Sequence, residues 1–203
     1  MKVVFEEPGV YIVDDFLEDP DSSRQHALSS EFPLVGPFPG FRTRSPAPEW
    51  GDVNKHKFEE ILGRPIRQWP KREWPNGGAG NTVFHVAFAS AKPSIHWDNG
   101  EWSAVLYLTP NPPADSGTTI WVDEHTNTYK YDDFIAAGNT NIAQGKWKPL
   151  KVLEPKYNRL VLYPANFIHC ATRAGFGNTM ETARLTQVYF FATEKDQWIE
   201  KVS

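Results

Sequence analysis

The 203-residue sequence predicts a mainly β protein of the α+β class, a β-sandwich or double-stranded β-helix (jelly roll) flanked by N-terminal helices. Two segments with helix signals come first, and short runs rich in β-branched and aromatic residues follow from residue 81 onward. Proline and glycine, with 17 and 14 residues, separate these runs as turns separate strands. The hydrophobic content of 40% indicates a packed core, and the length fits one domain over residues 1–203.

Residues 1–80 are expected to support the strands that follow. The expected elements are a strand over 9–17, a helix over 19–32, an irregular segment over 33–50 and a second helix over 56–66. Asp19 is a candidate N-cap of the first helix, and Gly63 with Pro65 is expected to end the second. The segment between the helices is rich in proline, which lacks the backbone donor that a regular element needs.

Residues 81–193 are expected to form the jelly-roll core. The expected strands cover residues 81–90, 94–97, 103–110, 117–123, 158–165, 167–172 and 184–193. Proline, asparagine, aspartate and glycine stand between them, as turns require. The polar segment 124–150 interrupts the series and is expected to be an insertion or lid with some helix.

Composition and charge exclude several classes of protein. The formal net charge is −4 without a block of Lys or Arg, so a nucleic-acid partner is not indicated. The single cysteine, Cys170, excludes an intramolecular disulfide and an all-cysteine zinc site. Glu6, Glu7 and Pro8 interrupt any apolar signal segment, and no run is long enough to span a bilayer. We therefore expect a soluble cytoplasmic protein, whose oligomeric state the sequence does not indicate.

The segment SIHWDNG, with His96 and Asp98, is a candidate half of a metal site. Side chains two apart on a strand point to the same face, so an imidazole and a carboxylate would stand together. His169 lies about 70 residues further on in the sequence. Two imidazoles and one carboxylate occupy one face of a metal and leave three positions open, as in non-haem Fe(II) oxygenases. The pattern alone is common by chance in a chain with six histidines.

The other histidines have simpler interpretations. His26 and His56 fall in the expected helices, where solvent-facing positions are favoured, and His125 falls at the edge of the polar insertion. His85 lies within the apolar run NTVFHVAF. It is either a core histidine with satisfied hydrogen bonds or a group that faces a site.

A second pair of residues fits a buried carboxylate ligand such as the far end of 2-oxoglutarate. Arg184 opens the apolar run RLTQVYFFAT, and its planar guanidinium can donate two parallel hydrogen bonds to a carboxylate. Thr186 shares its face and can donate a third. The alternative is an arginine at the end of a strand followed by a threonine of ordinary β propensity.

The sequence resembles the iron(II)- and 2-oxoglutarate-dependent dioxygenases of the prolyl-4-hydroxylase-like branch. The segments that carry the resemblance are, in order, YIVDDFLEDPDSSRQHAL, SIHWDNG, SAVLYLTP, GTTIWVD, NRLVLYPANFIHCAT and RLTQVYFF. Together they cover nearly the whole chain apart from residues 33–80 and 124–150. Ordered agreement over six segments is more specific than three ligands alone.

The resemblance implies a cofactor set of Fe(II), 2-oxoglutarate and O2. It assigns the iron to His96, Asp98 and His169, and the C5 carboxylate of 2-oxoglutarate to Arg184 with Thr186 assisting. Tyr107 matches a position where a tyrosine hydroxyl reaches the same carboxylate, and the alternative is a packed core aromatic.

The chain also departs from the family pattern. Arg184 lies fifteen residues after His169, further than in many relatives, which makes Arg173 a rival partner for the carboxylate. Phe88 stands where relatives often carry a tyrosine, so one hydrogen bond to the co-substrate is missing or comes from His85.

The resemblance implies hydroxylation of a C–H bond in a small-molecule or peptide substrate, with release of succinate and CO2. Four aromatic residues flank the expected site, and core packing is the commoner role for such residues: Trp97, Trp102, Trp121 and Phe167. Arg42 and Arg44 could contact an acidic group, although solvated loop arginines are the favoured interpretation. Residues 33–50 and 124–150 are the candidate lids.

Two other classes of function stay open at this stage. One is a cupin-like metal-bound enzyme that is not an oxygenase, which would be expected to use more histidines. The other is a β-sandwich that has lost catalysis and binds a peptide or a sugar. The retained ligand set and the Arg184–Thr186 pair favour the oxygenase over both.

Overall fold

The computed structural model describes residues 1–44, 48–69 and 80–194, without the side chains of residues 48–52. The strands are β1 (Lys2–Glu6), β2 (Val10–Asp14), β3 (Leu34–Gly36), β4 (Phe38–Arg42), β5 (Val83–Ala87), β6 (Trp102–Tyr107), β7 (Thr118–Asp123), β8 (Trp147–Leu153), β9 (Leu160–Pro164), β10 (His169–Ala171) and β11 (Arg184–Phe191). The helices are α1 (Pro20–Ser29), α2 (Pro48–Leu62), α3 (Tyr131–Ala136) and the 3-10 turn η1 (Ile142–Gln144).

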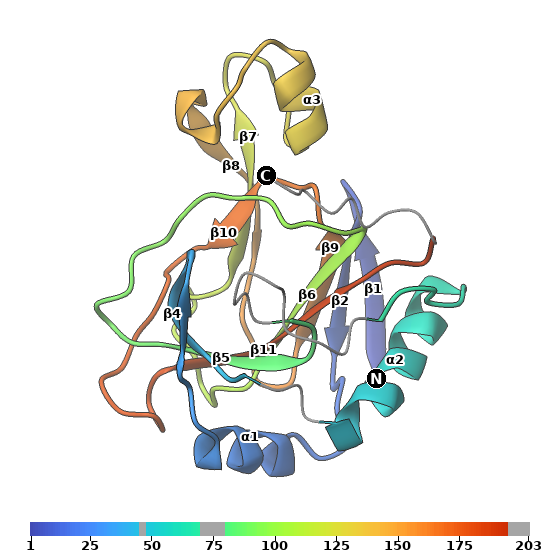
Figure 1. Ribbon diagram of the computed structural model, residues 1–203, viewed down its shortest axis with the longest axis vertical. Coiled ribbons are helices and arrows are strands. Elements are labelled where there is room, and N and C mark those ends of the chain that lie inside the picture. Colours follow the sequence, from blue (N-terminus) through green and yellow to red (C-terminus); the bar gives the residue numbers. More distant parts are fainter. Residues whose placement is uncertain (45–47, 70–79, 195–203) are drawn as a thin grey trace.

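The described strands form two antiparallel sheets, which confirms a mainly β protein (Figure 1). The larger sheet has eight strands in the order β1-β2-β9-β6-β11-β5-β4-β3, and the smaller has three in the order β10-β7-β8. In Figure 1, α1 and α2 lie along the lower part of the molecule, whereas α3 lies at the opposite end, beyond β7 and β8. The arrangement is consistent with a β-sandwich whose N-terminal helices lie on one side.

The central strands of the larger sheet are buried on both faces, and the alternation along β11 shows how. Leu185 and Tyr189 belong to the main hydrophobic core, which also contains Ala27 of α1 and Phe58 of α2. The helices therefore cover this face of the sheet. The intervening residues of β11, beginning with Arg184, line a cavity on the opposite face.

A second apolar cluster joins the two sheets. It contains residues from β2, β6, β7, β8 and β9 and from the turn before β10: Val10, Tyr107, Ile120, Leu153, Val161, Tyr163 and Phe167. This cluster holds the smaller sheet against the inner face of the larger one. The candidate site lies beside it, because His169 is the first residue of β10.

The expectation that residues 33–50 form no regular element is wrong, since this segment contains β3, β4 and the start of α2. Each of the two strands is short, and β4 pairs with β5 through Phe41 and Arg42, so Pro39 of β4 lies outside this pairing. Gly40 has φ of +89° and lies against the carbonyl of Val86, a position that no side chain fits. The second helix ends at Leu62 as expected, with Gly63 at φ +65°.

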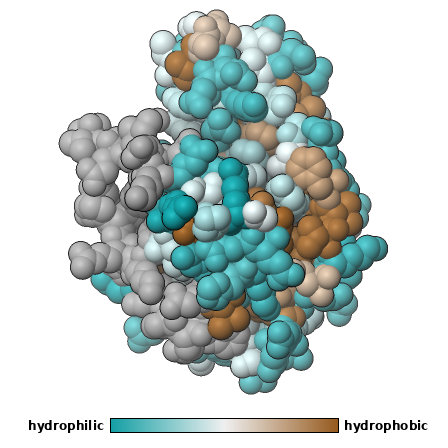
Figure 2. Space-filling model, turned by 90° about the vertical axis from the view of Figure 1, so that its right-hand side faces the viewer, coloured by the Kyte–Doolittle hydropathy of each residue, from teal (hydrophilic) through white to brown (hydrophobic). Residues whose placement is uncertain are grey.

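Strand β1 was not expected from the sequence, and it forms an edge of the larger sheet. It pairs only with β2, and its residues Val3, Val4 and Phe5 are 42, 40 and 54% exposed. Figure 2 views the molecule from the side on which Figure 1 shows β1 and α2, and hydrophobic atoms gather on part of a mainly hydrophilic face.

Two further expectations about strands are corrected. Residues 94–97 form no strand, and His96 makes a single isolated bridge to His169. Strand β8 starts inside the segment 124–150 and pairs along the whole of β7. Most of its side chains are exposed, so the sequence WKPLKVL lacks the apolar run that marks a buried strand. The rest of that segment contains α3 and η1, which agrees with the expectation of an insertion with some helix.

Among the described residues, no helix combines the length and the apolar character that crossing a membrane requires.

Candidate metal centre

His96, Asp98 and His169 come together into one cluster. One ligand atom of each residue lies within 4.8 Å of the others. The Nε2 atom of His169 is 3.3 Å from one carboxylate oxygen of Asp98, and the Nε2 atom of His96 is 3.7 Å from the other. His169 is buried, and the other two are partly exposed. The side chains that the sequence placed at one metal site are thus neighbours in space.

Isolated backbone hydrogen bonds position the cluster, and the strand expected over 94–97 is absent. The N–H of His96 donates to the carbonyl of His169 at 2.9 Å, and the N–H of His169 donates back at 2.8 Å. The N–H of Asp98 donates to the carbonyl of Ala165 at 2.9 Å. A bridge and a single further bond therefore fix both residues of the His-x-Asp pair against the chain that carries His169.

Both imidazole rings are oriented by their Nδ1 atoms. The Nδ1 of His96 is 2.8 Å from the carbonyl of Ser94, and the Nδ1 of His169 is 2.7 Å from the carbonyl of Phe167. A carbonyl only accepts, so each Nδ1 carries a proton, and a ring in its neutral form then keeps its lone pair on Nε2. Two Nε2 lone pairs and a carboxylate then converge, which is the donor set that a divalent metal requires.

The carboxylate of Asp98 is held in its ionised form. Ser103 on β6 donates a hydrogen bond of 2.7 Å to its Oδ2 atom. Burial acts to raise the pKa of Asp98, but the neighbouring His169, His96 and Ser103 outweigh it and hold this pKa below its ordinary value. The pKa of His96 is lowered by burial and by His169, which favours the neutral ring. Ser103 is a supporting residue that the sequence did not reveal.

An inner cavity of about 70 Å³ extends from the cluster along the inner face of the larger sheet. Its lining includes the three cluster residues together with Arg42, His85, Thr118, Tyr163, Arg184 and Thr186. The strand register explains this gathering, since Arg42 pairs with His85, His85 with Thr186, and Thr186 with Tyr107. Four neighbouring strands thus carry polar side chains in one row across the sheet.

Arg184 and Thr186 lie where a buried anion could be bound. Arg184 is 5% exposed, and its Nε donates to the carbonyl of Ser116 at 3.2 Å. It forms no ion pair with any residue that the structure describes, and burial lowers its pKa. The hydroxyl of Thr186 is buried and has no hydrogen-bond partner. An unpaired guanidinium and an orphaned hydroxyl on one cavity wall fit a carboxylate ligand.

Tyr107 and His85 stand in different relations to the cavity. The hydroxyl of Tyr107 is hydrogen-bonded to that of Thr118 at 2.9 Å, and its ring lies 5.7 Å from the guanidinium of Arg184. Tyr107 therefore packs behind the lining. His85 lines the cavity, and its Nε2 contacts the carbonyl of Pro39. Burial and then the charges of Arg42 and Arg184 hold the pKa of His85 well below its ordinary value, so this ring is neutral.

The favoured interpretation of Arg42 as a solvated loop residue is wrong. Arg42 is the last residue of β4, is half-buried and lines the inner cavity, and its guanidinium lies 4.0 Å from the ring centre of Phe38. Arg44 is exposed and does not line the cavity, in agreement with that interpretation. The rival carboxylate partner, Arg173, is also exposed and faces Asp115 at 3.7 Å. Arg173 does not line the inner cavity.

Two further residues complete the surroundings. Tyr163 on β9 lines the inner cavity, and its ring packs edge-on against that of His169 with centroids 4.8 Å apart. Sequence patterns do not single out Tyr163, which is one aromatic residue within an apolar run. Phe88 follows β5 and packs against the helix-side core, and it does not line the inner cavity.

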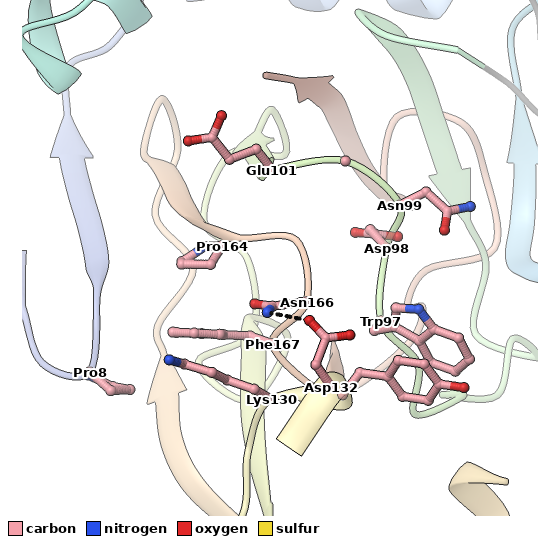
Figure 3. Close-up of a pocket in the computed structure, with 12 residues that line it drawn as sticks. Pro8, Trp97, Asp98, Asn99, Glu101, Lys130, Asp132, Pro164, Asn166 and Phe167 are labelled. Atoms are coloured by element: carbon pink, nitrogen blue, oxygen red, sulfur yellow. Dashed lines mark hydrogen bonds between the residues drawn. The ribbon is translucent and has the colours of Figure 1, made fainter. Parts of the chain in front are cut away.

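An outer pocket of about 420 Å³ lies on the other side of the His-x-Asp turn (Figure 3). Trp97, Asp98 and Asn99 line it together with Lys130 and Asp132 from the start of the insertion helix. The ring of Trp97 stacks on that of Tyr131, with centroids 3.4 Å apart. Asp98 lines both pockets, so the outer pocket reaches the metal cluster from the solvent side.

The flanking aromatic residues divide between the pockets and the core. Phe167 lines the outer pocket together with Trp97, whereas Trp102 packs into the helix-side core. The indole of Trp121 donates to the sulfur of Cys170 at 3.2 Å, and neither residue lines a pocket described here. His26, His56 and His125 are exposed and belong to neither pocket, as expected.

Comparison with known proteins identifies the fold. HygX from Streptomyces hygroscopicus, solved with nickel, 2-oxoglutarate and hygromycin B bound, superposes with a TM-score of 0.55 and 12% identity over 89% of this chain and 81% of that chain. A prolyl-4-hydroxylase from Pseudomonas putida superposes with a TM-score of 0.52 and 14% identity over 92% and 93%. No family model matches the sequence, and a search of curated proteins found no match. At this identity the likeness establishes a shared fold.

Proposed function

We propose that this protein is an Fe(II)- and 2-oxoglutarate-dependent dioxygenase that hydroxylates a C–H bond of a small-molecule or peptide substrate. The observation that carries the proposal is one cavity that joins the His96, Asp98 and His169 cluster to the buried Arg184 and Thr186. The fold shared with a prolyl-4-hydroxylase and with a 2-oxoglutarate-bound protein supports it. The two antiparallel sheets are then the two halves of a jelly roll.

The iron would be held by the Nε2 atoms of His96 and His169 and by the carboxylate of Asp98. The Nδ1 hydrogen bonds to backbone carbonyls keep both lone pairs on Nε2, and Ser103 fixes the carboxylate that faces them. Three protein ligands on one face leave positions for the co-substrate and for O2.

The far carboxylate of 2-oxoglutarate would be bound by Arg184 and Thr186. The guanidinium of Arg184 has no carboxylate partner among the described residues, and burial makes such a partner valuable. The hydroxyl of Thr186 gains a hydrogen bond that it lacks in the free protein. Tyr107 would support this site indirectly, because its hydroxyl is hydrogen-bonded to Thr118 and its ring lies beside the guanidinium of Arg184. His85 contributes a neutral ring to the cavity wall.

The bound iron, 2-oxoglutarate and O2 would supply the oxidising chemistry, with release of succinate and CO2. The protein's own contribution is to bind, to orient and to exclude water. The stack of Trp97 on Tyr131 ties the insertion helix α3 to the turn between two ligands. We infer that the 124–150 segment, rather than the sheet-bound β3 and β4, covers the site when a substrate enters.

The alternatives of a metal-bound non-oxygenase and a non-catalytic peptide or sugar binder are less well supported. The buried Arg184 lines the same cavity as the metal cluster and has no ion pair among the described residues, which favours the oxygenase because it fits the far carboxylate of 2-oxoglutarate.

The direct test is succinate formation from 2-oxoglutarate under O2 with added Fe(II), in the wild type and in Asp98→Ala. Slow turnover without any other substrate is expected in the wild type, and candidate substrates should raise it and gain the mass of one oxygen. No succinate from the wild type under any of these conditions would contradict the proposal.

A further inference from the structure

Arg42 is a second, half-buried cation in the inner cavity, and the proposed 2-oxoglutarate site leaves it unused. Its Nε atom is buried without a hydrogen-bond partner, and it forms no ion pair with any residue in the described part of the chain. Its guanidinium is stacked on Phe38 and lies further away, at 5.9 Å, from the ring of Phe190. Burying a charge without a partner is costly, so a ligand that pairs with it would be bound strongly.

Arg42 and Arg184 occupy different parts of the cavity. The guanidinium of Arg42 stacks on Phe38, and Arg42 pairs with His85 on the neighbouring strand. Arg184 pairs with Ala87, donates through its Nε to the carbonyl of Ser116 and lies 5.7 Å from the ring of Tyr107. The two guanidinium groups therefore have different neighbours and can serve two separate anionic groups in the cavity that also contains the metal cluster.

The balance of charge indicates which anion Arg42 binds. The charged side chains that line the inner cavity are Arg42, Arg184 and Asp98. The two positive charges of a divalent metal and the two negative charges of 2-oxoglutarate cancel, so one positive charge is left over in a small cavity. A single further negative charge balances it.

We propose that Arg42 binds a carboxylate of the primary substrate beside the metal cluster, so that the substrate is a small molecule or peptide with an acidic group. This inference rests on the proposed function. The other source of a carboxylate there is the metal-side end of 2-oxoglutarate itself, and the experiment separates the two.

The test uses the full-length protein loaded with Mn(II), which does not turn over, and saturated with 2-oxoglutarate. The probe is acetate labelled with carbon-13 at its carboxyl carbon, and acetamide is its neutral counterpart. Mn(II) speeds the relaxation of a carbon nucleus that is bound close to it. Acetate should show a saturable effect in the wild type, and acetamide should show none.

Arg42→Gln is expected to weaken acetate binding by about tenfold or more, because one charge-assisted hydrogen-bonded contact is lost. Arg42→Lys should retain part of the effect, because it keeps the charge without the planar fork. The exposed neighbour Arg44→Gln is the matched control and should stay within about twofold of the wild type. Circular dichroism spectra and melting temperatures establish that each variant is folded.

Three outcomes would overturn the inference. Acetate relaxation that is equal in the wild type and Arg42→Gln would mean that acetate binds the metal directly. If Arg42→Gln loses as much affinity for 2-oxoglutarate as Arg184→Gln does, Arg42 binds the co-substrate and not the primary substrate. A wild type that binds neither Mn(II) nor 2-oxoglutarate would refute the proposed function itself, which the first two outcomes leave intact.

Discussion

His96 and His169 are joined through their backbones, each donating its N–H to the carbonyl of the other at 2.9 and 2.8 Å. Their rings lie 4.4 Å apart, centre to centre. Two candidate ligands that are 73 positions apart in the sequence are thus fixed to one another before any metal arrives. The ligand geometry therefore depends on the backbone, and the residues around it tune how well a metal is held.

Ser103→Ala should weaken metal binding without unfolding the protein. The substitution removes the 2.7 Å hydrogen bond that orients the Asp98 carboxylate, and losses of this kind cost roughly 10- to 100-fold in metal affinity. Titration with Mn(II), followed by electron paramagnetic resonance, measures the change. Ser29→Ala, on the outer side of α1, serves as the control and should bind Mn(II) like the wild type. An unchanged affinity in Ser103→Ala would remove Ser103 from the account.

Arg184→Gln should weaken 2-oxoglutarate binding by about 30-fold or more, because a buried charge-paired contact is lost. Its affinity for Mn(II) in the absence of 2-oxoglutarate should stay near that of the wild type. Calorimetric titration of the metal-free protein with Mn(II) measures the metal affinity, and titration of the Mn(II)-loaded protein with 2-oxoglutarate measures the co-substrate affinity. Arg173→Gln is the control, since Arg173 is exposed and lies outside the cavity. A larger loss in Arg173→Gln than in Arg184→Gln would reverse the assignment.

Gly40→Ala should be much more destabilising than Gly63→Ala, although both glycines have positive φ. A Cβ at Gly40 would lie 2.1 Å from the carbonyl oxygen of Val86, whereas nothing lies within 4 Å of one at Gly63. We expect a loss in the free energy of unfolding of roughly 2–4 kcal/mol for the first and about 1 kcal/mol for the second. Urea denaturation checks both values, and equal losses would show that the close approach of β4 to β5 does not matter.

The ion pair between Asp14 and Arg159 should stabilise the protein only above acidic pH. The Nε of Arg159 donates to Asp14 at 2.7 Å, and this hydrogen bond with that of Lys156 lowers the pKa of Asp14 from 3.8 to about 2. The carboxylate of the folded state is the weaker base, so its contribution is full above pH 3.8 and is lost as the pH falls toward about 2.

The pH dependence of Arg159→Gln tests this contribution. Its loss in unfolding free energy relative to the wild type should be largest near neutral pH and should shrink as the pH falls toward about 2. Urea denaturation at a series of pH values gives the curve. The variant Arg64→Gln, which removes an exposed ion pair to Glu101, provides a comparison from another part of the surface. A difference between Arg159→Gln and wild type that is constant with pH would contradict the assignment to Asp14.

The metal cluster could be predicted from the sequence, but for a partly mistaken reason. His96 and Asp98 do stand together, yet a bridge and a turn place them there rather than a strand over 94–97. Arg184 and Thr186 share one face because they lie on a real strand, where alternation holds. Alternation within a strand can be read along the chain, whereas an isolated backbone bridge between distant residues leaves no local pattern.

Strand β8 and Arg42 show what a local pattern cannot reveal. Most side chains of β8 are exposed, so its own sequence carries no apolar strand pattern. The strand forms because it pairs along the whole of β7, which is distant in the sequence. Arg42 was hard to predict because it follows a run of prolines and glycine that suggests a loop. Its place in the inner cavity depends on the register with His85. Such features become visible only when the neighbouring strand is known.

The central claim is that one cavity binds iron and 2-oxoglutarate together, and anaerobic titration tests it most directly. Fe(II) and then 2-oxoglutarate are added to the wild type without O2, and the weak visible charge-transfer band of an iron–2-oxoglutarate chelate is followed. We expect a band that saturates in the wild type, is absent from Asp98→Ala, and needs far more 2-oxoglutarate in Arg184→Gln. A wild type that shows no band at saturating concentrations of both would contradict the claim.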